Sequence, residues 1–392
     1  MLFSEIAAHI GIDKYPQTMD GIYETIKNDA GPACDLVIIK NLQRQYDVFG
    51  KYYADVVETA QQINEDCHRS AWVKTAAAYA MGASAEETKR IPGPAFGENK
   101  VDDYLRLHML IPLIPTSIAE YEKRGFSQEE ITHLLASYKL SMSIVEEQTG
   151  RPGINVVYLA WMSIFAKAGI FETDGLQFEL YQLPQGAVYL KNRESGDVTA
   201  VLTQGLFHAS GIQLVGAKGF EEEEGSFSVT FREDGENYYG HRSLCKTADR
   251  NIAVFPKDKW EIAAKAGDDC LSIHIPRNAD ISPTTLDKAI ANAQNILETR
   301  FPEHKGSMIY AASWILDPTL EEFMSDSSNL IRFARRFVRY PQKSDGMHVF
   351  GFVFPKRFES YESLPETSSL TRGLKRVYME GRYIYFYHGL II

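Results

Sequence analysis

One short stretch combines residues that could do chemistry. Residues 271–283 read LSIHIPRNADISP. Because side chains alternate across a strand, Ser272 and His274 share one face while Leu271, Ile273 and Ile275 share the other. An imidazole with its ordinary pKa of about 6.5 takes up and releases protons near neutral pH. His274 is therefore a candidate general base.

The loop after this strand has the features of an anion site. Pro276 cannot donate to a strand ladder, so it favours a gap beside the strand. Ser282 before Pro283 predicts a helix start, whose amides carry partial positive charge. Arg277 adds a full charge in front of that helix, and Asn278 tolerates the left-handed backbone with which a loop gathers its N–H groups. These features indicate a place for a phosphate.

Each of these residues also has a structural interpretation. His274 could be a hydrogen-bonded histidine near a strand end, Arg277 a solvated loop charge, and Ser282 only a helix cap. Asp280 opposes anion binding, since its carboxylate competes for the same amides. Asp317 precedes a proline and is expected to cap a helix rather than to act in acid–base chemistry.

The first part of the chain has helical periodicity and helical punctuation. Ser127 and Glu130 form a capping-box pattern, and Gly150 with Pro152 ends the segment that follows it. Pro112 is expected to bend or break one of the helices, as is a second proline at 115. The predicted helices cover 36–47, 49–65, 70–82, 101–124 and 127–150, with a further helix over 153–168 at the junction.

After about residue 170 the hydrophobic period changes from 3.6 to 2. Strands are expected over 175–183, 186–191, 197–203, 226–231 and 237–243, with a hairpin turn at Asp234 and Gly235 and a solvated loop at 221–225. Then follow a strand at 270–276, a helix at 283–300, a strand at 307–315, helices at 318–324 and 328–340, and strands at 347–354 and 383–389. This order predicts a mixed sheet with one parallel pair.

The fold class is therefore α+β: a helical N-terminal domain at 1–150 is followed by a mixed α/β domain with a largely antiparallel sheet at 151–392. The chain has 392 residues and a formal charge of −11, which works against nucleic-acid and anionic-membrane partners. The four scattered cysteines fit a cytoplasmic protein. Sequence motifs of P-loops, dinucleotide-binding folds, zincins and α/β-hydrolases do not occur, and no histidine spacing predicts a metal site.

Four segments together resemble a bacterial protein family. LSIHIPRNADIS at 271–282, SWILDPTLEEFMSDSSNLIRF at 313–333, VFGFVFP at 349–355 and LPETSSLTRGLKR at 364–376 are similar to the C-terminal domain of GNAT-like acyltransferases. That family places a helical acyltransferase domain in front of it. The resemblance implies a GNAT-like domain and an N-acyltransferase whose co-substrate is acetyl-CoA or another acyl-CoA.

The resemblance also implies roles for particular residues. In GNAT proteins a glycine-rich loop between a splayed strand and the next helix binds the coenzyme A pyrophosphate, and a tyrosine after the following strand protonates the leaving thiolate. Here the loop lacks the glycines and the segment 317–329 lacks a tyrosine. The resemblance thus leaves Ser327, Ser328 or Tyr310 to replace the tyrosine, and His274 and Ser327 are the catalytic candidates. It assigns cofactor binding to Ile275, Arg277, Asn278, Ala279 and Ser282.

The main hypothesis is transfer of an acyl group from coenzyme A to a small-molecule amine. The glycine-poor loop favours a second hypothesis, a non-catalytic GNAT-like protein that binds a ligand or partner. A third is an unrelated two-domain enzyme that uses carboxylates such as Glu179 or Asp317. A homodimer is also considered, because the aromatic segment YIYFYHGLII could pack inside the sheet or against another subunit.

Overall fold

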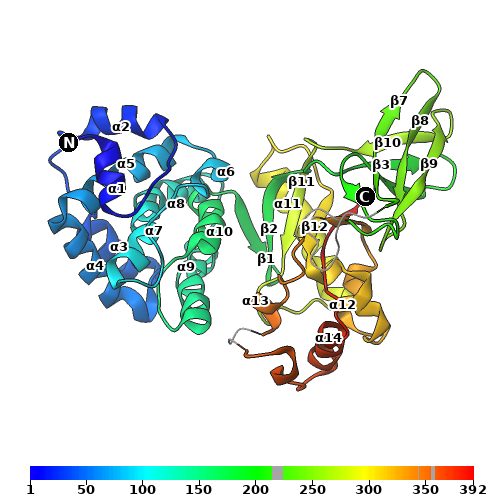
Figure 1. The fold of residues 1–392 in the computed structure, drawn as a ribbon. Coiled ribbons are helices and arrows are strands. Elements are labelled where there is room, and N and C mark those ends of the chain that lie inside the picture. The colour runs from blue at the N-terminus through cyan, green and yellow to red at the C-terminus, as the bar shows by residue number, and fades with distance from the viewer. Residues whose placement is uncertain (214–223, 343, 355–357) are drawn as a thin grey trace. The chain divides into compact units, whose positions relative to one another are not determined.

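The computed structural model describes residues 1–213, 224–342, 344–354 and 358–392, and it divides into two compact units, Met1–Glu172 and Thr173–Ile392 (Figure 1). The first unit ends after the junction helix that the sequence assigned to the second domain. Most of the loop predicted at 221–225 falls outside the described residues; Glu224 and Gly225 lie in a turn.

The first unit is helical, as predicted. Its helices are α1 (Phe3–His9), α2 (Thr18–Ile26), α3 (Leu36–Tyr46), α4 (Tyr53–Glu65), α5 (Cys67–Gly82), α6 (Ala85–Thr88), α7 (Lys100–Leu110), α8 (Ile114–Lys123), α9 (Gln128–Thr149) and α10 (Val156–Ala166), with 3₁₀ turns at Gly50–Tyr52 and Ile111–Leu113. The second of these turns separates α7 from α8 at the prolines, which confirms the predicted break. Ser127 and Glu130 form the expected capping box of α9, and Gly150 ends it in the left-handed conformation.

Helix α7 is the core of the first unit, since every residue from Asp102 to Leu110 is buried. Its polar side chains therefore need internal partners. Arg69 Nε donates to Asp102 at 2.8 Å, Arg151 Nε donates to Asp103 at 2.7 Å, and the ring of His108 lies 2.8 Å from the Thr59 hydroxyl. Burial lowers the pKa of His108 to about 3.

Five strands of the second unit belong to a six-stranded sheet in the order β1-β2-β11-β12-β14-β13, and β1 is the segment in which the first unit ends. Its strands are β1 (Ile170–Thr173), β2 (Leu176–Gln182), β11 (Asp269–His274), β12 (Ile309–Ser313), β13 (Val338–Gln342) and β14 (Phe386–Ile391). The pair β11 and β12 is parallel, as predicted, and the neighbouring pairs are antiparallel. Helix α11 (Pro283–Arg300) joins the parallel strands (Figure 1) and buries Leu286, Ala289, Ala293 and Leu297. Strand β14 lies inside the sheet, which decides between the two placements considered for the C-terminal segment.

A second sheet, in the order β10-β3-β4-β8-β7 with β9 paired to β8, comes from residues 187–264. Its strands are β3 (Ala187–Asn192), β4 (Val198–Leu202), β7 (Phe231–Glu233), β8 (Asn237–Ser243), β9 (Ala248–Pro256) and β10 (Trp260–Ala264), and the short strands β5 (Leu206–Phe207) and β6 (Phe227–Ser228) form a separate pair. One buried cluster joins the two sheets. It combines Tyr189, Ala200 and Leu202 of the second sheet with Cys270, Tyr310, Tyr340 and Leu390 of the first.

Several predicted elements are wrong. The helix expected at 328–340 is a short α12 (Asn329–Ala334) followed by β13, because Val338 to Gln342 pair with β14. The strand expected at 347–354 contains instead α13 (Phe350–Val353), whose Phe350 packs in an aromatic core. The helix expected at 318–324 is a 3₁₀ turn, Pro318–Glu322, and the strand at 226–231 is divided between β6 and β7. Strands β9 and β10 and helix α14 (Ser369–Met379) were not predicted.

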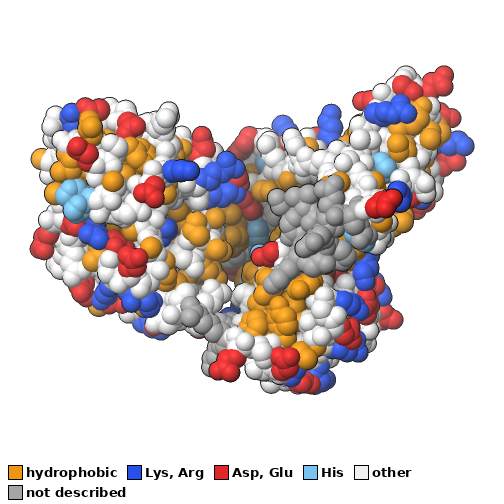
Figure 2. Space-filling view, in the orientation of Figure 1, with side chains coloured by type: hydrophobic (Ala, Val, Ile, Leu, Met, Phe, Trp, Pro, Cys, Tyr) orange, Lys and Arg blue, Asp and Glu red, His pale blue; other side chains and the backbone are white. Residues whose placement is uncertain are grey.

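The surface carries both signs of charge. On the face drawn in Figure 2, Lys and Arg side chains lie among Asp and Glu side chains, with apolar side chains between them. On this face the acidic side chains are therefore interspersed with basic ones. Within the described part of the chain, no helix is both long enough and apolar enough to cross a membrane.

A close backbone contact at the start of the parallel pair gives a stability prediction. A Cβ added to Gly306 would lie 1.5 Å from the carbonyl oxygen of Asp269. We expect Gly306→Ala to lower the free energy of unfolding by about 1–3 kcal/mol, because the backbone must move to admit the methyl group. Urea unfolding measures this change.

Gly235→Ala is the matched control, since a Cβ there meets no atom within 4 Å. It should change the free energy of unfolding by less than about 0.5 kcal/mol. Equal effects of the two substitutions would contradict the role given to the Gly306 contact.

Candidate active site

The two parallel strands of the first sheet separate at their carboxyl ends. Leu271 pairs with Ile309 and Ser272 with Tyr310, and in the described strands the pairing of β11 with β12 goes no further. Beyond that point Ile273 and His274 pair only with β2, whereas residues 311–313 pair with β14. The end of this pairing before Pro276 agrees with the interruption predicted from the proline. A gap between parallel strands exposes backbone groups that a bound molecule can use.

His274 lies at the end of β11 and has a carboxylate partner. Its Nε2 is 2.9 Å from Oε2 of Glu179, which belongs to the neighbouring strand β2. The side chain of His274 is 31% exposed and that of Glu179 is 14% exposed. The tautomer that donates Nε2–H to Glu179 has its lone pair on Nδ1, and the carboxylate orients the ring. The arrangement is an imidazole–carboxylate pair at the end of the strand.

The same face of the sheet continues into a buried polar cluster. Ser272 lies opposite both Glu179 and Tyr310 in the strand register, so all three share the face of His274. The hydroxyls of Tyr310 and Tyr340 lie 2.9 and 3.0 Å from Nδ1 of His388. Burial lowers the pKa of His388 to about 4 and raises the pKa of Tyr310 well above its usual value. Tyr310, considered as a proton donor, is thus a neutral phenol held by a neutral histidine.

The loop after β11 contains the predicted left-handed residue, but one of its backbone N–H groups forms a hydrogen bond within the loop. Asn278 has φ 68°, and the Ala279 N–H closes a turn on the Pro276 carbonyl at 3.1 Å. Arg277 is exposed on this turn, and Ile275 follows the last residue of the strand. The Ala279 amide is therefore already engaged within the loop, and the guanidinium of Arg277 lies on its exposed side.

The start of α11 is capped by two side chains. Ser282 is the N-cap, and Pro283 occupies the first helical position, as predicted. Asp280 accepts from the backbone N–H of Ser282 at 2.8 Å and from its hydroxyl at 2.9 Å. The Thr285 hydroxyl also donates to Asp280, and these three hydrogen bonds lower the pKa of the carboxyl. The predicted competition of Asp280 for this helix end is thus present in the structure.

Ser327 and Asp317, which the sequence analysis also considered, lie on segments other than β11 and its loop. Ser327 is exposed in the turn before α12, and its hydroxyl is 2.8 Å from that of Ser325. Asp317 is buried and accepts from the backbone N–H groups of Thr319 at 2.7 Å and Tyr385 at 2.6 Å. Burial raises the pKa of Asp317. The predicted capping role of Asp317 is confirmed, and it also fixes the segment that leads into β14.

Sequence reasoning did not find the pairing of His274 with Glu179. Glu179 was considered only as a carboxylate of an unrelated enzyme, because nothing in a single sequence states which strand lies beside β11. The signal that exists is the alternation in residues 176–182, which places Gln177, Glu179 and Tyr181 on one face. Among the described residues no group of three or more His, Cys, Asp or Glu side chains is placed to hold a metal ion.

The family model for the GNAT-like C-terminal domain matches residues 170–391. The chain belongs to this family. The match begins at β1 and ends in β14, so it covers both sheets and the separated strand pair. No curated protein matches the chain by sequence.

Solved structures with the same fold include acyltransferases. A mutant acyltransferase in complex with octanoyl-CoA has a TM-score of 0.67 at 16% identity, and an acyltransferase in complex with decanoyl-CoA and teicoplanin has a TM-score of 0.65 at 16% identity. Each comparison covers 100% of this chain and 99% of the other chain. At these identities the similarity shows that the fold, including the helical first unit, is shared.

The buried histidine of the polar cluster gives a prediction for pH. His388 is neutral in the folded protein down to about pH 4, whereas in the unfolded chain it takes a proton near pH 6.5. Stability is therefore highest above pH 6.5 and falls as the pH is lowered towards 4, by up to about 3 kcal/mol from this group. His388→Gln should reduce this slope in urea unfolding measured across that range.

Tyr310→Phe is the control, because it removes a hydroxyl partner but keeps His388 and so should keep the slope. His108 acts with the same sign in both variants and does not affect their difference. If His388→Gln and Tyr310→Phe show the same pH dependence, the buried neutral histidine is not its source.

Proposed function

We propose that this protein is an acyl-CoA-dependent N-acyltransferase that acts on a small-molecule amine. The observation that supports it best is His274, paired with Glu179, at the point where β11 and β12 separate. A thioester placed in that gap would lie next to a base and next to the loop at 275–282. The shared fold with acyltransferases that bind acyl-CoA adds support.

The reaction requires a base, a group that polarises the thioester carbonyl and a site for the pyrophosphate. The amine attacks the thioester carbonyl, a C–N bond forms, and the C–S bond breaks to release the coenzyme A thiolate. Nδ1 of His274 takes the proton that the amine loses, while Glu179 holds the ring and balances the charge of the imidazolium. The backbone N–H of Ile275 polarises the carbonyl, since it lies just beyond the end of the strand. Arg277, Asn278, Ala279 and Ser282 hold the pyrophosphate, with Arg277 supplying the charge.

We do not propose Ser327 as the residue that protonates the leaving thiolate, because its hydroxyl forms a hydrogen bond with that of Ser325. Octanoyl-CoA and decanoyl-CoA in the related structures favour a medium-chain donor as the first one to test, ahead of acetyl-CoA. The teicoplanin complex supports a small-molecule acceptor. The four free thiols fit the proposed cytoplasmic location.

A second candidate function is a non-catalytic ligand-binding protein. It is favoured by the hydrogen bonds of Ala279 and Asp280, which occupy amides that the pyrophosphate would use. Thiol release from decanoyl-CoA in the presence of a panel of amines separates the two functions. Release that depends on an amine supports the enzyme, whereas calorimetric binding without release supports the binding protein.

The role of His274 gives a sharp prediction. His274→Gln keeps a polar side chain of similar size but removes the base. We expect turnover to fall by about 10²–10⁴-fold while the affinity for coenzyme A stays the same. Full turnover of this variant from pH 6 to pH 9 would leave His274 with a structural role only.

Glu179→Gln tests the carboxylate that positions the ring. It should lower turnover by about tenfold or more, less than His274→Gln does, and leave coenzyme A affinity unchanged. Its pH–rate profile should move relative to that of the wild type, because the charge beside the base is lost. Glu179→Asp should restore part of the rate, and an unchanged profile in Glu179→Gln would remove Glu179 from the mechanism.

The role of Arg277 is tested by binding. Arg277→Ala should raise the dissociation constant for coenzyme A about tenfold or more, since it removes a charge-assisted phosphate contact of roughly 1.5–3 kcal/mol. Lys305→Ala is the control, because this exposed lysine lies in the loop before β12 and donates to Pro302. Equal affinities of the two variants would exclude a phosphate role for the loop.

A further inference from the structure

Helix α7 carries an arginine that is buried while several of its hydrogen-bond donors are unused. Arg106 lies in the core of the first unit and is 7% exposed. Its Nη2 donates to the carbonyl oxygen of Gly93 at 2.9 Å. Its Nε and Nη1 are buried and have no hydrogen-bond partner among the described residues. The N–H groups on these two nitrogens therefore lack the acceptors that buried donors need.

The two acidic residues of the preceding helical turn are already paired with other arginines. Asp102 accepts from Nε of Arg69 at 2.8 Å and from its Nη2 at 3.0 Å. Asp103 accepts from Nε of Arg151 at 2.7 Å. Burial lowers the pKa of Arg106, although the charges of both carboxylates act in the opposite direction. Each carboxylate is thus matched by an arginine of its own, and the charge of Arg106 is left over.

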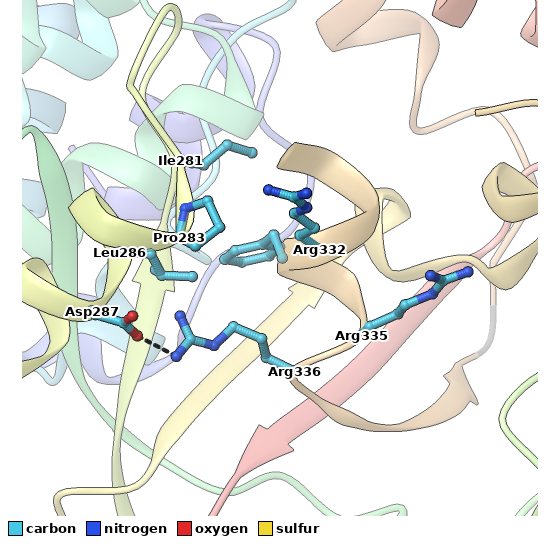
Figure 3. A pocket seen from close by; sticks show the side chains of 8 residues that line it. Ile281, Pro283, Leu286, Asp287, Arg332, Arg335 and Arg336 are labelled. Carbon is cyan, nitrogen blue, oxygen red and sulfur yellow. Dashed lines mark hydrogen bonds and ion pairs between the residues drawn. The ribbon is translucent and has the colours of Figure 1, made fainter. Parts of the chain in front are cut away.

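Arginines of the second unit show the usual arrangement. In the pocket drawn in Figure 3, Arg336 forms an ion pair with Asp287. Arg335 of the same pocket pairs with Glu321 at 2.8 Å and with Asp326 at 2.7 Å. Both arginine side chains are also partly exposed, so water can reach the donors that the carboxylates leave free. The buried arginine of α7 has neither kind of partner in the described part of the chain.

A glycine brings the loop at 91–97 directly onto the guanidinium group of Arg106. A Cβ added to Gly93 would lie 2.9 Å from both Cζ and Nε of this arginine. Two hydrogen bonds attach the loop to α7. One is the bond from Arg106 to Gly93, and the other, of 2.6 Å, runs from the N–H of Gly97 to Asp103. Movement of this loop away from α7 would therefore uncover the unused donors.

The chemistry of the site selects a small ligand with one negative charge. One guanidinium without a counter-charge balances one anionic group, and its planar N–H donors match the two oxygens of a carboxylate. A site enclosed by α7 and a short loop favours a ligand of few atoms. Away from water, a charge-assisted hydrogen bond of this kind is strengthened.

We propose that the first unit binds a small monocarboxylate, of about the size of acetate, at Arg106, and that the loop at 91–97 opens to admit it. The carboxylate accepts from the N–H groups that have no partner in the ligand-free protein. This site lies in the helical unit, apart from the residues to which we assign acyl transfer.

Thermal unfolding of the full chain at neutral pH tests the site, with sodium chloride replaced stepwise by sodium acetate at constant ionic strength. The Tm of the wild type should rise by about 3–6 °C and then level off, because a ligand that binds only the folded protein stabilises it. Arg106→Met should lose this rise, since it keeps a long side chain but removes the charge and the donors. Arg90→Ala is the matched control, because the side chain of Arg90 is 76% exposed beside the same loop, and it should keep the rise.

Gly93→Ala provides a second variant, in which Arg106 is kept. Its Cβ meets the flexible end of an arginine side chain, so the chain can fold while the guanidinium group is displaced. The rise in Tm should then need about fivefold more acetate or more. Gly82→Ala, whose Cβ meets no atom within 4 Å, should respond as the wild type does. The proposal is overturned if the wild type has the same Tm in acetate and in chloride, or if Arg106→Met keeps the rise.

Discussion

The site depends on the separation of β11 from β12. Two register pairs join these strands, and beyond Ser272 and Tyr310 each strand pairs with a different neighbour. A parallel pair is normally buried and continuous, because unpaired backbone groups inside a protein are costly. Here the pairing of β11 with β12 ends next to His274 and the loop that leads into α11. The residues to which we assign the chemistry lie on β11, on its neighbour β2 and on that loop.

Along one face of the first sheet the polar side chains change from buried to partly exposed. At the Cys270 end it is covered by the second sheet and holds the phenols of Tyr310 and Tyr340 against His388. At the other end it carries Glu179 and His274, which remain partly exposed. Burial holds His388 neutral down to about pH 4, whereas His274 has a carboxylate partner and is partly exposed. Two histidines on one face thus differ through their surroundings alone.

The sequence was sufficient where local signals and tertiary packing agree. The proline break between α7 and α8, the capping box of α9 and the Ser282–Pro283 start of α11 are all written in a few neighbouring residues. Prediction from the sequence failed where pairing with a distant strand determines the secondary structure. Residues 338–342 follow a basic helix, and their sequence suggests that the helix continues. They form a strand instead, because they pair with β14. The link between His274 and Glu179 spans 95 positions, and no short pattern could reveal it.

The position of β14 has a consequence for the order in which the protein can be made. This strand lies between β12 and β13, with Ile309 next to Ile391 and Val338 next to Leu390. On the ribosome β12 and β13 emerge before residues 386–391, so until β14 is available β12 has one unpaired edge and β13 has no neighbouring strand in this sheet. The helical unit is translated earlier and needs none of these contacts, so it can fold while the sheet is incomplete. During that interval the unpaired edges of β12 and β13 are available for wrong pairing, which makes this stage of synthesis the one at which a chaperone would be of most use.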